Sequence, residues 1–146
     1  IRTAQATGQA AGSIDAVIAA WMLYHVPSLD AALGEIRRVL RPEGALFAVT
    51  NGELHLATLF ADAGVDPPLS SFTSETGQAI LHRHFGLVAR TDIRTTATFQ
   101  DHSSAAAYLG TIDPSWAAAL PAFEGVRQDY GYTTVFIATE PHPTGR

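Results

Sequence analysis

Residues 14–51 read IDAVIAAWMLYHVP, SLDAALGEIRRVLR and PEGALFAVTN, and this stretch decides the fold. An apolar run breaks at Pro27 and gives way to an amphipathic segment, which ends at Pro42 and is followed by a second apolar run. Short apolar runs with β-branched residues are typical of strands, and apolar residues at three- and four-residue spacing are typical of a helix. The stretch therefore predicts a strand over 16–20, a helix within 28–41 and a strand over 45–50.

The first strand is apolar without alternation, which is typical of a central parallel strand with helices over both faces. We therefore expect both of its faces to be buried. Ser28 is suited to cap the helix, and Asp30 suits the positive end of the helix dipole. Pro42 cannot continue the helix, and Gly44 allows a tight turn back into the second strand. Together these signals predict a right-handed strand–helix–strand unit.

The rest of the chain alternates helix and strand signals. We expect Asn51 to cap a helix that Gly64 ends, and Pro121 to break the last helix. The expected helices cover 53–63, a segment that starts at Ser74, 103–109 with Ser103 as the cap, and a segment that starts at 113–115. The expected strands cover 86–99 and 132–139, and residues 140–146 are expected to form a frayed tail. No repeat or linker divides the sequence, so we expect one domain of the α/β class over 1–146.

Composition narrows the function classes. The chain has 146 residues, no cysteine and a formal net charge of −5, and it carries no extended basic cluster. Disulfides, thiolate chemistry and binding of nucleic acid are therefore not expected. No apolar run reaches the length of roughly 20 residues that spans a bilayer, and no secretion signal is visible, so we expect a cytoplasmic protein without membrane contact. The six histidines have no metal-ligand spacing, so no metal is expected.

Several motifs resemble class I S-adenosylmethionine-dependent methyltransferases, and within them the branch that acts on small molecules. The resemblance is carried by residues 14–27, by EIRRVLRP at 35–42 and by TNG at 50–52, and it is extended by FTSETG at 72–77, LHRHF at 81–85 and VFIA at 135–138. It implies the C-terminal half of a Rossmann-like methyltransferase sheet with flanking helices. The strands would be the family's fourth to seventh, with the last one antiparallel between the fifth and sixth. It also implies S-adenosylmethionine as the cofactor.

The sequence departs from the family at its start. The family opens with a strand and a glycine-rich turn of the G-x-G-x-G type, which let the backbone approach the cofactor. Gly8 and Gly12 do not match this element and are typical of a loop. We therefore expect the chain to be a fragment or truncated form of a methyltransferase, with the strand at 16–20 left at an exposed apolar edge. Such an edge favours association, so we expect a homodimer or a domain-swapped assembly.

The resemblance also implies site residues. Thr3 and Ala4 stand where the family commonly has an Asp-Ala pair that holds adenine. The implied cofactor-binding residues are Thr3, Ala4, Ala20, Trp21 and Leu23, and the implied substrate residues are Tyr24, Asn51 and His55. His25 is the candidate catalytic residue, because an imidazole can take a proton from a substrate hydroxyl or amine near neutral pH.

Each of these assignments has a structural alternative. Trp21 can be an aromatic residue of the core or of a dimer interface, His25 a hydrogen-bonded structural histidine, and Asn51 a plain helix cap. Two functions therefore stay open. One is a methyltransferase that acts on a small molecule. The other is a methyltransferase-derived pseudoenzyme that serves as a binding or assembly module, or that catalyses a different reaction in the old substrate pocket.

Overall fold

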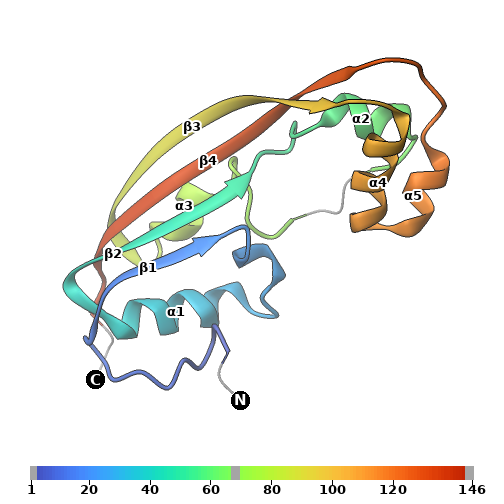
Figure 1. Ribbon diagram of the computed structural model, residues 1–146. Coiled ribbons are helices and arrows are strands. Elements are labelled where there is room, and N and C mark those ends of the chain that lie inside the picture. Colours follow the sequence, from blue (N-terminus) through green and yellow to red (C-terminus); the bar gives the residue numbers. More distant parts are fainter. Residues whose placement is uncertain (1–2, 67–69, 144–146) are drawn as a thin grey trace. The chain divides into compact units, whose positions relative to one another are not determined.

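The computed structural model describes residues 3–66 and 70–143, and it has an α/β fold with an open four-stranded sheet (Figure 1). The elements are β1 (Ile14–Ala20), a short 3-10 helix η1 (Leu23–His25), α1 (Leu29–Val39), β2 (Leu40–Asn51), α2 (Ala57–Asp62), α3 (Gly77–Leu81), β3 (Phe85–Phe99), α4 (His102–Ile112), α5 (Pro114–Ala119) and β4 (Arg127–Pro141). This confirms the predicted fold class.

The chain divides into two compact units. The first comprises Ile1–Gly52, Ser70–Ile93 and Thr133–Arg146, and the second comprises Glu53–Leu69 and Arg94–Tyr132. The long strands β3 and β4 each contribute residues to both units. The helices in the described part of the chain are all too short or too polar to cross a membrane.

The strand order is β1-β2-β4-β3. β1 pairs with β2 in parallel, with Ile18 opposite Phe47 and Ala20 opposite Val49. β4 pairs with β2 in the antiparallel direction, with Ile137 opposite Phe47. The last strand therefore lies between the second and third, antiparallel to the second, as the sequence predicted.

The unit β1-α1-β2 forms as its signals indicate. The Ser28 hydroxyl accepts a hydrogen bond from the amide of Ala31 at 3.3 Å, so Ser28 is the predicted cap of α1. The helix ends at Val39, and β2 begins at once at Leu40. The predicted turn is instead a bulge within β2, because four residues, 41–44, lie opposite Asp15 alone.

The bulge explains one glycine. A Cβ atom at Gly44 would lie about 3.0 Å from the carbonyl oxygen of Arg41 and 3.1 Å from that of Asp15. A side chain at this position would push against both backbones and force them apart by a few tenths of an ångström, so glycine suits this close approach. The exposed side chains of Arg41 and Asp15 form an ion pair across the same bulge.

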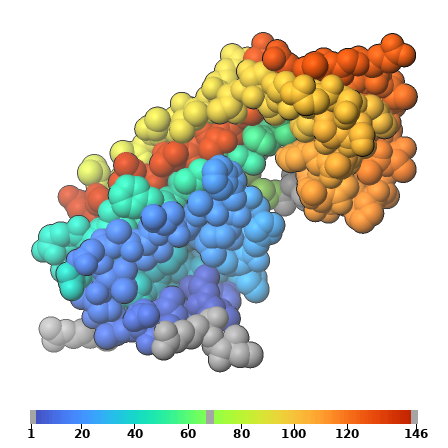
Figure 2. All heavy atoms as spheres, viewed as in Figure 1, coloured from blue at the N-terminus to red at the C-terminus, as the bar shows by residue number. Residues whose placement is uncertain are grey.

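One face of the sheet carries the core of the first unit. Leu33 and Ile36 of α1 and Leu81 of α3 pack with buried residues of the strands, namely Ala19, Leu46, Ala48, Phe136 and Ala138. Residues 3–12 run along α1, as the dark blue atoms in Figure 2 show. There Thr7 donates to the Glu35 carboxylate at 2.6 Å, and Gly8 and Gly12 lie in this loop, as predicted.

The opposite face of the sheet corrects the sequence prediction. Ile18 is 76% exposed and Ile137 is 37% exposed, and both flank the half-buried Phe47. The expectation that both faces of the first strand are buried is therefore wrong for Ile18. The physical reason is that α1 and α3 pack on one side only, and no described helix contributes to a core on the other side.

Several helix starts also differ from prediction. α2 begins at Ala57 instead of residue 53, and Leu56 precedes it in a left-handed conformation with φ 55°. Asn51 is the last residue of β2, paired with Thr133, so its predicted role as a helix cap is wrong.

Three further starts show which caps the sequence reveals. Thr73, not Ser74, accepts from the amides of Glu75 and Thr76 ahead of α3. Asp101, not Ser103, caps α4 in a capping box with Ser104. Asp113 caps α5 at the predicted place. The helix α5 ends at Ala119, before Pro121, as predicted.

The second unit has its own core. Its buried residues come from α2 and its two flanking residues, the end of β3, α4 and the residue that follows α5, and they are Leu56, Leu59, Phe60, Ala63, Phe99, Ala105, Leu109 and Leu120. The buried Asp129 carboxylate accepts the amide of Leu59, at the third position of α2, at 2.6 Å. Asp129 therefore caps this helix from a strand 70 residues further along the chain.

The C-terminal segment is ordered further than the predicted tail suggests. β4 continues through Glu140 to Pro141, and the amide of His142 donates to the carbonyl oxygen of His84 at 2.9 Å. Residues 144–146 lie outside the described part of the chain.

Candidate functional site

The carboxyl ends of β1 and β2 meet at one edge of the sheet. Ala20 pairs with Val49, and the next residue of the first strand, Trp21, donates its amide to the carbonyl oxygen of Val49 at 2.9 Å. Trp21 then turns the chain with φ 49°, a left-handed conformation that costs free energy for a bulky side chain. In open α/β sheets ligands bind outside the carboxyl ends of the strands, so this edge is the candidate site.

Trp21, Asn51 and Thr133 form a hydrogen-bonded cluster at this edge. The indole Nε1 of Trp21 donates to Oδ1 of Asn51 at 3.0 Å, and the hydroxyl of Thr133 donates to the same oxygen at 3.1 Å. The three residues come from the ends of β1 and β2 and from β4. We name them the Trp21 cluster. Trp21 is 49% exposed, so its ring remains accessible beside the amide.

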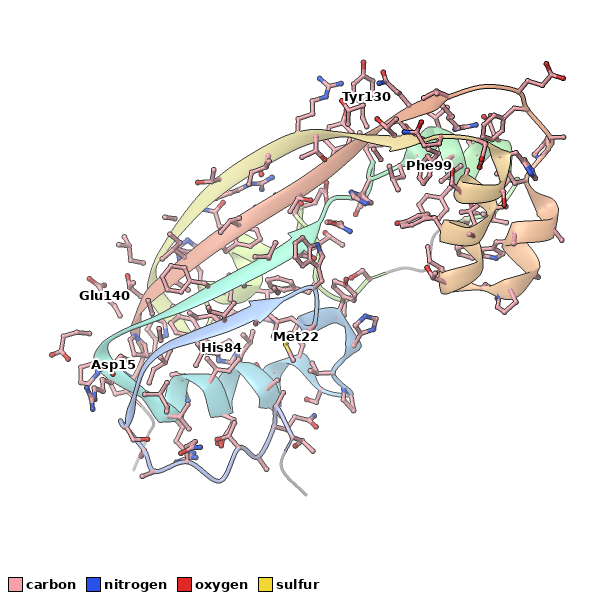
Figure 3. All side chains as sticks on the ribbon, in the orientation of Figure 1. Asp15, Met22, His84, Phe99, Tyr130 and Glu140 are labelled. Carbon is pink, nitrogen blue, oxygen red and sulfur yellow. The ribbon has the colours of Figure 1, made fainter. Side chains whose placement is uncertain are left out.

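The following turn carries the candidate catalytic residue. Tyr24 and His25 belong to η1, and their ring centroids lie 4.4 Å apart. His25 is exposed, and burial raises the pKa of the half-buried Tyr24. Met22, labelled in Figure 3, lies between Trp21 and this turn in the sequence. The imidazole of His25 is exposed, whereas burial favours the neutral form of Tyr24.

The other implied cofactor residues lie in different settings. Leu23 is 1% exposed and packs in the core of the first unit, so its side chain offers no surface to a ligand. Thr3 and Ala4 form a tight turn in which Thr3 and Ala6 exchange backbone hydrogen bonds. Gln5 joins this turn to the start of α1 through its bond to the carbonyl oxygen of Ser28 at 3.4 Å. Ala20 is exposed next to Trp21.

His55 belongs to the second unit, where it contacts the backbone of Tyr132. Its Nδ1 accepts the amide of Tyr132 at 3.1 Å, so the ring proton sits on Nε2. Burial lowers the pKa of His55, although the Tyr132 amide and the nearby Asp129 carboxylate enter the balance as well. His55 is therefore a neutral acceptor at neutral pH and holds the backbone of β4.

Metal binding finds no support in the described residues. Across 3–66 and 70–143, no three His, Asp or Glu side chains gather closely enough to hold an ion. The sheet edge presents an aromatic face at Trp21, an oriented amide at Asn51 and an exposed imidazole at His25.

The sequence revealed only part of the Trp21 cluster. Trp21 and Asn51 follow strand signals and were expected at the site, but Thr133 was not. Thr133 lies 82 residues after Asn51 and reads as one of several β-branched residues in a strand. Only the pairing of β2 with β4 brings it to Asn51, and the predicted strand order was the one signal that could have found it.

The chain was compared with known proteins. Residues 2–48 match the family model described as a methyltransferase domain. No curated protein matches the sequence. Solved structures match over almost the whole chain at low identity, and such likeness shows the fold.

Three of these structures illustrate the match. A protein of Bacillus halodurans described as a candidate methyltransferase has a TM-score of 0.61 and 12% identity, with 96% of this chain and 70% of that chain covered. A SAM-dependent methyltransferase of Thermotoga maritima, described as a possible histamine N-methyltransferase, has a TM-score of 0.55 and 20% identity, with 94% and 61% covered. A phosphoethanolamine N-methyltransferase of Haemonchus contortus, in complex with phosphomonomethylethanolamine and S-adenosylhomocysteine, has a TM-score of 0.52 and 13% identity, with 96% and 36% covered.

Proposed function

From its class I methyltransferase fold, we propose that this chain works as an S-adenosylmethionine-dependent methyltransferase that acts on a small molecule. The observation that carries the proposal is the exposed ring of Trp21 beside Asn51 at the carboxyl ends of β1 and β2. One structural neighbour is described as a possible histamine N-methyltransferase, and another is in complex with phosphomonomethylethanolamine; both compounds are small molecules and support the substrate class.

The residues at this edge fit one part of the cofactor. The exposed aromatic face of Trp21 suits a sulfonium, because the π-electrons of an indole attract a positive charge. Ala20 leaves room next to that face. Thr3, Ala4, Ala20, Trp21 and Leu23 include no carboxylate for the ribose hydroxyls, so the fit concerns the methionine end. When bound, S-adenosylmethionine supplies an electrophilic methyl group.

The contribution of the chain to catalysis is mainly orientation. A nucleophile held in line with the methyl group reacts faster, because it loses little translational and rotational freedom on reaching the transition state. Trp21 and Asn51 would hold the reactants at the sheet edge. The acceptor oxygen or nitrogen would lose its proton as it gains the methyl group and the methyl–sulfur bond breaks to leave S-adenosylhomocysteine, and the exposed imidazole of His25 would take that proton.

Calorimetry tests this proposal. S-adenosylhomocysteine and S-adenosylmethionine are titrated into the wild-type chain, a Trp21→Ala variant and a Trp116→Phe control. We expect both ligands to bind the wild type. Trp21→Ala should weaken S-adenosylmethionine by about fivefold more than S-adenosylhomocysteine, because only the former carries the sulfonium charge. No detectable heat from either ligand at millimolar concentration would contradict the proposal.

The second function, a binding or assembly module, is favoured by the edge of the sheet. β1 ends the strand order of the described residues, and its Ile18 is exposed. Unpaired backbone groups and an apolar side chain together favour pairing with a second copy, as a homodimer or a domain-swapped assembly. Light scattering after gel filtration tests this. We expect a dimer for the wild type and a monomer for Ile18→Lys, and a wild-type monomer at high concentration would exclude the assembly.

A further inference from the structure

The hydrogen bonds of the Trp21 cluster fix the orientation of the Asn51 amide. An indole nitrogen can only donate, so the Asn51 atom that contacts Nε1 of Trp21 must be the amide oxygen. The Thr133 hydroxyl, 3.1 Å from the same oxygen, must then donate to it as well. Both donors converge on Oδ1. The opposite end of the amide, the Nδ2 group with its two N–H donors, has no recorded partner among the described residues.

The residues around Asn51 indicate which kind of ligand can reach these N–H donors. Asn51 is half-buried at the carboxyl end of β2, and the Trp21 ring beside it is exposed. Asn51 pairs with Thr133 across the strands. The next pair on the same face of the sheet, Val49 and Val135, adds two apolar side chains beside them. A ligand that stacks on the indole therefore lies beside the Nδ2 donors of Asn51, and the neighbouring Thr133 hydroxyl has already given its proton to Oδ1.

We infer that Asn51 binds an oxygen acceptor, a carbonyl or a carboxylate, on a small planar ligand that stacks on Trp21, and that Trp21 and Thr133 are the positioning residues for this amide. That the ligand is the methyl acceptor rests on the proposed function. The binding preference itself does not, because it follows from the fixed amide alone. The Nδ2 group of Asn51 can only donate, so a ligand group that also only donates would leave both sets of donors unpaired and is disfavoured there.

Three matched probes test the preference without any cofactor. Acetophenone carries a carbonyl, benzoate a carboxylate and benzylamine an ammonium group on the same ring. Their dissociation constants are measured by saturation-transfer NMR on the full chain. We expect acetophenone and benzoate to bind at least about fivefold more tightly than benzylamine. Equal affinities within twofold, or no binding of any probe, would overturn the inference.

An isosteric variant reverses the group that faces the ligand. In Asn51→Asp one oxygen still accepts from Trp21 and Thr133, and a second oxygen replaces the N–H donors. We expect acetophenone and benzoate to bind at least about tenfold more weakly, and benzylamine to become the preferred probe. An unchanged order of preference would overturn the inference.

A second variant tests the positioning role of Thr133, and its result can be interpreted even if Asn51→Asp fails to fold. Thr133→Val removes one of the two donors that hold Oδ1, and we expect acetophenone to bind about two- to fivefold more weakly. Thr139→Val is the control, because Thr139 lies on the same face of the same strand and its side chain makes no hydrogen bond to residues 3–66 or 70–143. An equal effect of both substitutions would count against the positioning role.

The outcomes separate this inference from the proposed function. If S-adenosylhomocysteine binds in calorimetry but the probes show no preference, the acceptor assignment fails and the methyltransferase proposal stands. If the probes show the preference but neither cofactor form binds, the Trp21 cluster is a ligand site of another function.

Discussion

The helices α1 and α2 follow strands in similar sequence settings but obtain their caps in different ways. The start of α1 is held by Ser28, three residues before the amide that it accepts. The start of α2 is held by Asp129, which lies 70 residues away on β4. The difference teaches that a local cap can be read from sequence, whereas a helix capped from a distant strand begins where the tertiary fold supplies the acceptor.

The largest effect is expected at the distant cap. Asp129→Ala leaves the buried amide of Leu59 without an acceptor and removes a carboxylate 3.8 Å from the Arg127 guanidinium. We expect the free energy of unfolding to fall by about 2–3 kcal/mol, measured by urea denaturation. Amide exchange at residues 57–62 should accelerate selectively, and a loss below about 0.5 kcal/mol would show that α2 does not depend on Asp129.

A smaller effect is expected at the local cap. Ser28→Ala should lower the free energy of unfolding by about 1 kcal/mol.

Asn51→Ala is the matched test of the predicted cap that the structure rejects. It should leave amide exchange in α2 unchanged, because Asn51 ends β2 and bonds to Trp21 and Thr133. Faster exchange in α2 on Asn51→Ala would restore Asn51 as a cap.

The smallest effect concerns pH and a distant contact to α1. The buried His84, labelled in Figure 3, places its Nε2 atom 2.9 Å from Asp30 in the first turn of α1. Burial lowers the pKa of His84 below the ordinary histidine value of about 6.5, although Asp30 opposes this shift. The folded state therefore binds fewer protons than the unfolded state. The stabilisation is complete above about pH 6.5 and is lost as the pH falls through the lowered pKa.

Urea midpoints at pH 7.5 and 5.5 check this direction. We expect a lower midpoint at pH 5.5 and a smaller difference in His84→Leu. The pKa of His55 is lowered in the same way, so one substitution removes only part of the dependence. Glu35 does not interfere, because hydrogen bonds from Arg38 and Thr7 lower its pKa to about 2 and its contribution is lost only below about pH 4.5. A higher midpoint at pH 5.5 would contradict the direction assigned to both histidines.

Sequence patterns predicted most of the first unit. Periodicity and the Ser28 cap located α1, and the apolar runs located β1 and β2, because these signals act between neighbours in the chain. The antiparallel place of the last strand followed from the family resemblance. The exposure of Ile18 could not be predicted, since an apolar run reads the same whether one or both of its faces are covered.

The candidate site, like the first unit, could be predicted only where the signals lie between neighbours in the chain. Trp21 and Asn51 directly follow strand signals at an edge where parallel strands end together. Thr133, which completes the cluster, is brought there by strand pairing over 82 residues. Leu23 was expected to contact a cofactor, but its side chain lies in the core, since nothing in an apolar run distinguishes the residue that points inward.

NMR can test directly the proposal that the carboxyl ends of β1 and β2 form a methyltransferase site. The two tryptophan indole N–H signals are followed by NMR while S-adenosylhomocysteine is titrated into the full chain. We expect the Nε1–H signal of Trp21 to shift in a saturable manner and the signal of Trp116, in the second unit, to stay in place. A Trp21 signal that stays in place at saturating ligand would contradict it.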